Sequence, residues 1–253
     1  MNTIRFKSLA IALSTIGAII LMSLSAPAFA QNPKKSDHKI KIYVEYKLAK
    51  DHLITDHNIQ VAVANGKITL TGNVPTLYDI TLAKKDARSV DNNYAVVDEL
   101  TAVAPEVPDS LIAHEVMHRI ETHDFYTVFD WVTTHSSNGV VTLRGWVNAP
   151  WYIRQYQSQA ERVVGVRKVV NDLKTAIGSD FLKYRAYRLI YSDPFYQDYA
   201  LEMNPPVHVI VNGASLILEG KVNTSGDRGY LADLMRFYTD APVVVDHLQV
   251  TSD

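Results

Sequence analysis

The sequence predicts an α+β fold of three tandem α-β-β-α-β units, each with two helices on one face of a mixed three-stranded sheet. Two repeated patterns and one repeated distance lead to this prediction. The first pattern is an Asn-Gly pair followed by alternating apolar residues and a second glycine. The second is a Val-Val pair followed by two polar residues and Leu. In all three copies, 26 residues separate the second glycine from the first polar residue after Val-Val.

The Asn-Gly pairs predict three β-hairpins, because Asn and Gly accept the positive φ angles of a two-residue turn. We expect each second glycine to mark the point where its strand bends away. The turn glycines recur at intervals of 73 and 74 residues, too long for a solenoid, so each copy should be a small domain with its own core. The predicted turn and strand-end residues are Asn65, Gly66, Gly72, Asn138, Gly139, Gly145, Asn212, Gly213 and Gly220.

Each copy begins with apolar residues at positions i, i+4 and i+8, which predicts a helix with one buried stripe. The three stripes are Ile40, Val44 and Leu48, then Ile112, Val116 and Ile120, then Leu182, Ala186 and Ile190. Asp37, Asp109 and Ser179 stand at the predicted N-caps. The segment joining the second and third strands is long enough for a helix, so these two strands should be parallel.

This order of helices, Asn-Gly turns, Val-x-Leu-x-Gly strands and Val-Val-x-x-Leu strands resembles the BON domain family. The resemblance covers nearly the whole chain after residue 30, with units expected at 37–104, 109–175 and 179–251. It implies envelope proteins that contact phospholipid or other envelope partners without catalysis. The shared motifs are structural, so they indicate a fold more specifically than a chemistry.

Residues 1–30 are typical of a secretory signal peptide. Arg5 and Lys7 precede an apolar run from Leu9 to Leu24, and a small-residue site ends at Ala30. We therefore expect cleavage after Ala30 and a periplasmic protein, with residues 31–36 as a polar leader. An uncleaved anchor helix is the alternative, although Ser and Gly residues interrupt the apolar run.

Composition narrows the function classes further. The chain has no cysteine, which excludes thiolate metal ligands, a Cys nucleophile and a lipid-anchored N-terminal Cys. Its formal charge is −2 and becomes more negative once the signal is removed, so nucleic acid is not an expected partner. No phosphate-binding loop or nucleophile elbow occurs, and we expect no cofactor. The sequence specifies no oligomeric state.

The segment His114-Glu115-Val116-Met117-His118 matches the H-E-x-x-H pattern of zinc metalloproteases. A catalytic zinc needs a third protein ligand, yet no Asp or Glu occurs from position 131 to 160. Repeat alignment places both histidines on the helix face opposite the buried stripe. We therefore predict an exposed polar face and no catalytic metal, with adventitious metal binding by the His pair as the alternative.

Aromatic and basic residues of the second and third units are the candidate lipid-binding groups, because tyrosine, tryptophan and cations suit the headgroup region of a bilayer. Packing of these side chains against a neighbouring unit is the competing interpretation. The candidates are Lys183, Tyr184, Arg185, Tyr187, Arg188 and Tyr191 on the first helix of the third unit, and Trp151, Tyr152, Arg154 and Tyr156 on the second helix of the second unit.

The sequence thus predicts an exported, non-enzymatic binding module that contacts phospholipid headgroups or another envelope component. One alternative is a periplasmic stress-protective holdase that binds unfolded protein clients in apolar grooves. A zinc hydrolase is the third hypothesis and depends entirely on the His114 to His118 segment.

Overall fold

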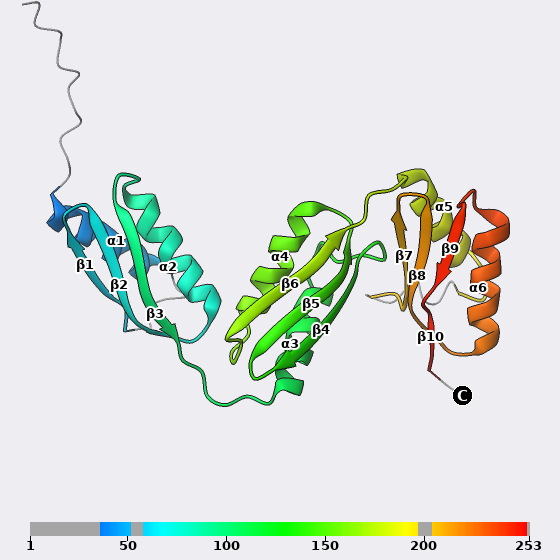
Figure 1. Ribbon diagram of the computed structural model, residues 1–253, viewed down its shortest axis with the longest axis horizontal. Helices are drawn as coiled ribbons and strands as arrows, with labels where there is room; N and C mark the ends of the chain where they lie inside the picture. The colour runs from blue at the N-terminus through cyan, green and yellow to red at the C-terminus, as the bar shows by residue number, and fades with distance from the viewer. Residues whose placement is uncertain (1–35, 52–57, 197–203, 252–253) are drawn as a thin grey trace, which may run out of the picture. The chain divides into compact units, whose positions relative to one another are not determined.

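The computed structural model describes residues 36–51, 58–196 and 204–251 (Figure 1). The predicted signal peptide and residues 31–35 of the leader lie outside this range. Residues 36–253 group as one unit by their contacts. Among the helices within the described ranges, none is long and apolar enough to cross a membrane.

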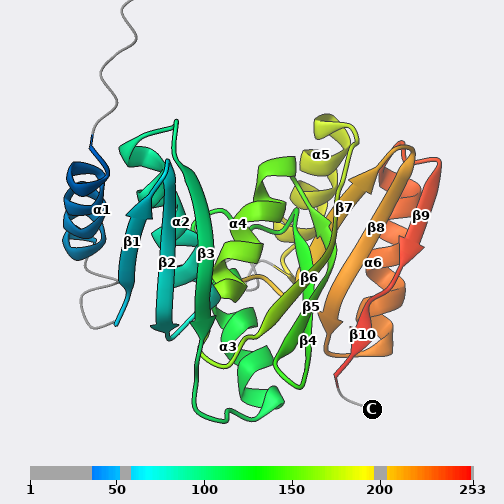
Figure 2. The ribbon, with the colours of Figure 1, turned by 60° about the vertical axis from the view of Figure 1, so that its left-hand side comes forward.

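The predicted order of elements is confirmed. Each unit contains a helix, two strands, a second helix and a final strand, and the two helices lie on the same side of the sheet (Figures 1 and 2). The first unit comprises α1 (Asp37–Lys50), β1 (Gln60–Ala64), β2 (Lys67–Val74), α2 (Leu77–Val90) and β3 (Ala95–Ala102). The second comprises α3 (Asp109–Glu121), β4 (Trp131–Ser137), β5 (Val140–Val147), α4 (Pro150–Glu161) and β6 (Lys168–Thr175). The third comprises α5 (Asp180–Tyr191), β7 (Val207–Asn212), β8 (Ser215–Val222), α6 (Ser225–Tyr238), β9 (Val243–Asp246) and β10 (Gln249–Val250).

Every sheet has the second strand in its centre. β2 pairs antiparallel with β1 and parallel with β3, and β5 has the same relation to β4 and β6. In the third unit the last strand is divided, because β9 and β10 each pair parallel with β8. The mixed sheet expected from a hairpin followed by a helical crossover is therefore present in all three units.

Each unit has its own apolar core between the sheet and its two helices. The three predicted helical stripes are buried, with exposures between 0% and 8%. In the first unit the stripe packs against Ile68 and Leu70 of β2 and against Leu82 and Ala83 of α2. The stripe therefore orients each first helix, and the opposite face is left for solvent or for a partner.

The second glycine of each pattern lies inside the central strand. The strand continues two residues past Gly72, Gly145 and Gly220. At Gly145 φ is +126°, and a Cβ would lie 1.9 Å from the carbonyl oxygen of Trp131. Glycine is required because the neighbouring strand approaches the backbone too closely for any side chain.

Two of the predicted helix caps are corrected. Ser36 caps α1, and Pro108 occupies the N-cap position of α3 without a side-chain bond. Asp37 and Asp109 are instead the first helical residues, and their carboxylates accept hydrogen bonds from the hairpin turn. Ser179 caps α5 as predicted, since its hydroxyl accepts from the Leu182 amide at 3.3 Å.

Candidate functional site

The outer face of α5 carries an exposed aromatic and basic surface. The inward stripe of Leu182, Ala186 and Ile190 fixes the rotation of this helix. On the opposite side Phe181 is 71% exposed and Tyr184 is 58% exposed. We call Phe181, Tyr184, Arg185, Arg188 and Leu189 the α5 face; with Ser192 these residues line a shallow hollow.

The two arginines of the α5 face differ in charge balance. Arg185 Nη1 lies 2.5 Å from Asp240 Oδ2, so its charge is compensated within the third unit. Arg188 is exposed and forms no ion pair with the part of the chain that the structure describes. Arg188 is therefore the cation of the α5 face that is most available to attract an anionic partner.

Lys183 and Tyr191 are not on the α5 face, although both were candidate lipid-binding residues. Lys183 is 6% exposed, and its Nζ donates to Asn148 Oδ1 at 2.8 Å and to Asp180 Oδ1 at 3.0 Å. Tyr191 is 7% exposed, and its hydroxyl donates to the Val207 carbonyl. Tyr191 is therefore not available to a membrane, because the buried side of α5 is wider than the stripe of Leu182, Ala186 and Ile190.

Tyr187 has the packing role that the sequence left open. Its ring lies 6.0 Å from that of Phe129 and 5.0 Å from that of Tyr191, and it packs against the third core. Tyr184 also meets Phe129, with 5.3 Å between ring centroids, but most of its surface stays open. Tyr184 therefore contacts the second unit and also keeps an exposed surface.

The start of α4 carries a second exposed aromatic surface. Trp151 is 63% exposed, Arg154 is exposed, and Tyr152 is half-buried. Tyr156, the fourth candidate of this group, is fully buried in the second core. Burial raises the pKa of the Tyr156 hydroxyl, which donates to the Phe125 carbonyl at 3.3 Å. Tyr156 is thus a core residue and cannot touch a membrane surface.

Phe125 completes this second surface and was missed by sequence reasoning. It is 47% exposed, and its ring stacks on Tyr152 with 5.7 Å between centroids and 15° between planes. Phe195 follows α5 at the equivalent position of the third unit and is 86% exposed. The shared Phe-Tyr pair in these two loops was the available signal. Phe125 was missed because loops have no periodicity that separates inward from outward residues.

The outer face of α1 was missed as well. Ile42, Tyr43 and Tyr46 are 49%, 53% and 62% exposed, and Lys41 and Lys47 flank them in the sequence. Ile42 and Tyr46 occupy the helical positions of Tyr184 and Arg188 in the third unit. Repeat alignment could have identified this face.

His114 and His118 are exposed on the outer face of α3, as predicted. Between them, Glu115 Oε1 lies 2.9 Å from Arg119 Nε. Within the ranges that the structure describes, no group of three or more His, Cys, Asp or Glu could hold a metal ion. The arrangement therefore lacks both a third ligand and a free carboxylate at the Glu115 position.

A buried polar cluster connects the second and third units. Asp130 is fully buried, and its carboxylate accepts from the Thr127 amide at 3.1 Å, the Thr127 hydroxyl at 2.8 Å and the Asn148 amide at 2.8 Å. Burial raises the pKa of Asp130, and these hydrogen bonds oppose that rise. Asn148 in turn accepts from Lys183, so residues of both units share one network.

His208 of β7 lies beside this cluster and is 1% exposed. Its ring centroid is 5.0 Å from that of Trp131 and 5.6 Å from that of Tyr126. Its Nδ1 has no hydrogen-bond partner among the described residues. Burial lowers the pKa of His208 to about 4, although backbone groups of Asp130 and Thr127 favour the protonated ring. The imidazole is therefore neutral near pH 7.

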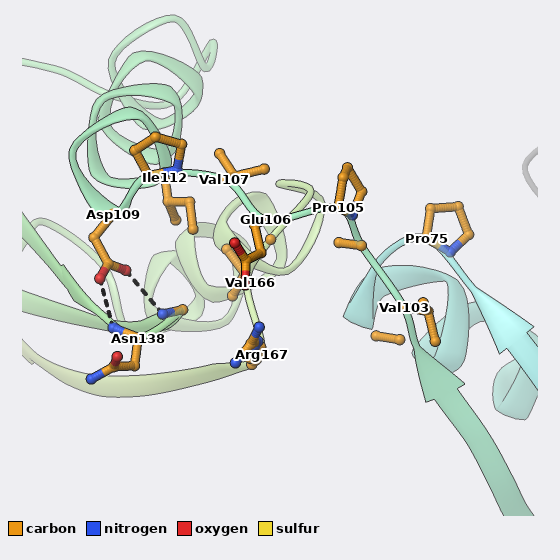
Figure 3. Close-up of a pocket in the computed structure, with 15 residues that line it drawn as sticks. Pro75, Val103, Pro105, Glu106, Val107, Asp109, Ile112, Asn138, Val166 and Arg167 are labelled. Atoms are coloured by element: carbon orange, nitrogen blue, oxygen red, sulfur yellow. Dashed lines mark hydrogen bonds between the residues drawn. The ribbon is translucent and has the colours of Figure 1, made fainter.

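The linker before α3 borders a hollow that also exposes the hairpin turn of the second unit (Figure 3). Asp109 binds this turn, accepting from the Asn138 amide at 2.7 Å and the Gly139 amide at 2.9 Å. A third bond from Ser136 contributes most to lowering the pKa of the Asp109 carboxyl. The turn amides are thus already occupied by Asp109 and are not available to a ligand in this hollow.

Comparisons with known proteins found one protein family and similar solved structures. The family model for the BON domain matches residues 36–104 and 108–176. Two solved structures of CdsD, a structural protein of the type III secretion system of Chlamydia trachomatis, are similar at 14% sequence identity. The C-terminal domain structure is matched over 81% of this chain and 96% of that chain, with a TM-score of 0.25. The other is matched over 83% and 93%, with a TM-score of 0.24.

A search of curated proteins gave no match. The family match alone spans more than half of the chain, in two consecutive copies that coincide with the first two structural units. The third unit repeats the same order of elements. The chain belongs to the BON domain family.

Proposed function

We propose that this protein is an exported, non-enzymatic module that associates with the cell envelope by contacting phospholipid headgroups. Proteins of the BON family are known for phospholipid binding and envelope association. The observation that carries the proposal is the α5 face, where exposed rings stand beside an arginine without an ion-pair partner in the described part of the chain.

The physical mechanism combines interfacial burial with charge. Phe181 and Tyr184 can enter the headgroup region, while Arg188 gains about 1 kcal/mol beside anionic lipid. The Phe125, Trp151 and Tyr152 surface and the outer face of α1 supply further weak contacts. Because the units are joined in one chain, each contact raises the effective concentration of the next.

A paired-variant experiment tests this surface. Tyr184→Ser with Arg188→Ser should weaken co-sedimentation with anionic vesicles about tenfold, because one ring and one cation are lost. The matched control is His114→Ser with His118→Ser, which changes the same two helical positions in the second unit and should leave binding unchanged. Equal binding by both variants and the wild type would remove the α5 face from the proposal.

A protein client is the alternative outcome. If vesicles fail to bind the wild type while aggregation of a denatured client is suppressed, the holdase hypothesis gains support. In that case the exposed rings would contact unfolded chains and the arginine would be dispensable.

A further inference from the structure

The outer face of α3 differs from the outer faces of α1 and α5. Where those faces present Ile42 and Tyr46, or Tyr184 and Arg188, α3 presents His114 and His118. Residues four apart on a helix are neighbours on one face, with about 5–6 Å between their Cβ atoms. Both imidazoles are exposed, so neither is used by the core.

We propose that His114 and His118 form a two-histidine site for a late first-row transition-metal ion, with Cu²⁺ as the tightest ligand. Imidazole nitrogen is a preferred donor for copper and zinc, and affinity in such sites peaks at Cu²⁺. Two histidines at i and i+4 can bind one ion from a single helix face.

The neighbouring side chains leave this pair accessible. Glu115 lies between the two histidines in sequence, but its carboxylate is paired with Arg119 at 2.9 Å. Val116 points into the core at 0% exposure. The Glu115 carboxylate is therefore engaged by Arg119, the Val116 side chain is turned away from the surface, and both imidazoles remain exposed.

The coordination is open. No third metal-binding side chain of the described residues joins the pair, so water or an external donor must fill the remaining positions. Such a site binds an ion without the general base and third ligand that a zinc protease requires. This inference is independent of lipid binding, since it uses a different face of a different unit.

The test is a titration of the full chain with CuSO₄ in a non-chelating buffer, followed by calorimetry and by electron paramagnetic resonance. We expect Cu²⁺ to bind about 100-fold more weakly to His118→Gln than to the wild type, because the variant lacks the second ligand. Zn²⁺ should bind more weakly than Cu²⁺. Mg²⁺ should not compete, because it prefers oxygen donors.

Two controls separate geometry from histidine content. His135→Gln removes an exposed histidine of β4 and should leave the site intact. His118→Gln combined with Glu115→His keeps the number of histidines but places them at i and i+1, where they do not face each other. That variant should lose the site. Equal Cu²⁺ affinity in the wild type and both His118 variants would overturn the proposal, as would equal loss in His135→Gln.

Discussion

Strands β1 and β7 occupy the same position in their units, yet only β7 is buried on both faces. The outward positions of β1 hold Gln60 and Ala62, which are exposed. The equivalent residues of β7 are His208 and Ile210, which are 1% and 0% exposed. The same fold therefore has an open sheet face in the first unit and a covered one in the third.

The second unit supplies the cover. Ile210 and Ile217 form a small cluster with Ala176, and Trp131 and Trp146 pack against it. A backbone bond from the Val209 amide to the Val128 carbonyl, 2.7 Å long, also joins β7 to the segment before β4. The comparison teaches that a repeated domain changes its strand composition where a neighbouring unit covers its sheet.

The largest effect is expected from exchanging the outward residues of β7 and β1. Ile210→Ala should cost about 3 kcal/mol of unfolding free energy, because it leaves a cavity in a packed cluster. Ala62→Ile adds the same side chain to an exposed position and should change stability by less than about 0.5 kcal/mol. Urea unfolding followed by tryptophan fluorescence measures both. Similar costs for the two changes would contradict the difference between the strands.

His208, the buried outward residue of β7, should make the free energy of unfolding depend on pH. The pKa of this imidazole is about 4 in the folded protein but about 6.5 when unfolded. Between these values the unfolded chain binds more protons, so stability should fall as pH drops from about 6.5 to about 4, by on the order of 3 kcal/mol.

His208→Gln should lack this component of the pH dependence, since it carries the residue found at the equivalent position of β1. Asp130 and Tyr126 face the same region and remain in the variant. His135→Gln is the control, because His135 is exposed. Parallel pH profiles for the wild type and His208→Gln would show that the buried imidazole does not resist protonation.

A smaller, local effect is expected at the hairpin turns. In the second unit Asp109 binds the turn amides of Asn138 and Gly139. In the third unit the Gly213 amide donates to the Ile177 carbonyl at 2.7 Å, so no carboxylate is required. Asp109→Ala should speed hydrogen exchange at Gly139, whereas Asp180→Ala should leave exchange at Gly213 unchanged.

The Asp109 effect should also depend on pH. Hydrogen bonds hold the pKa of this carboxyl below its ordinary value of 3.8. Its stabilising contribution is therefore present above that value and is lost as pH falls through the folded pKa. Protection of Gly139 in the wild type should approach that of Asp109→Ala in acid; a pH-independent difference would argue against the carboxylate contacts.

Much of the fold could be predicted from the sequence, because three helical stripes and three Asn-Gly turns repeat at nearly constant spacing. The stripes predicted the buried helix faces, and the long crossovers predicted the parallel strand pairs. The sequence also contains a signal for the covered face of β7, because every residue from Val207 to Val211 except His208 is apolar. This apolar composition reflects packing against the second unit, and periodicity within the third unit does not reveal that contact.

The candidate site could be predicted only in part. Tyr184, Arg188, Trp151 and Arg154 are exposed, as a role in surface contacts requires. Lys183 failed as a surface candidate because its partner Asn148 lies 35 residues away in another unit. Tyr191 failed because large side chains extend the core beyond the three-residue stripe of α5. Tyr156 failed because it lies on the side of α4 that packs into the second core.

The most direct test of the proposed function is flotation of the chain with liposomes of graded anionic content, at low and at physiological salt. The α5 face and the other exposed aromatic surfaces predict flotation that increases with anionic lipid and weakens with salt. Absence of flotation at every composition and at both salt concentrations would contradict headgroup binding.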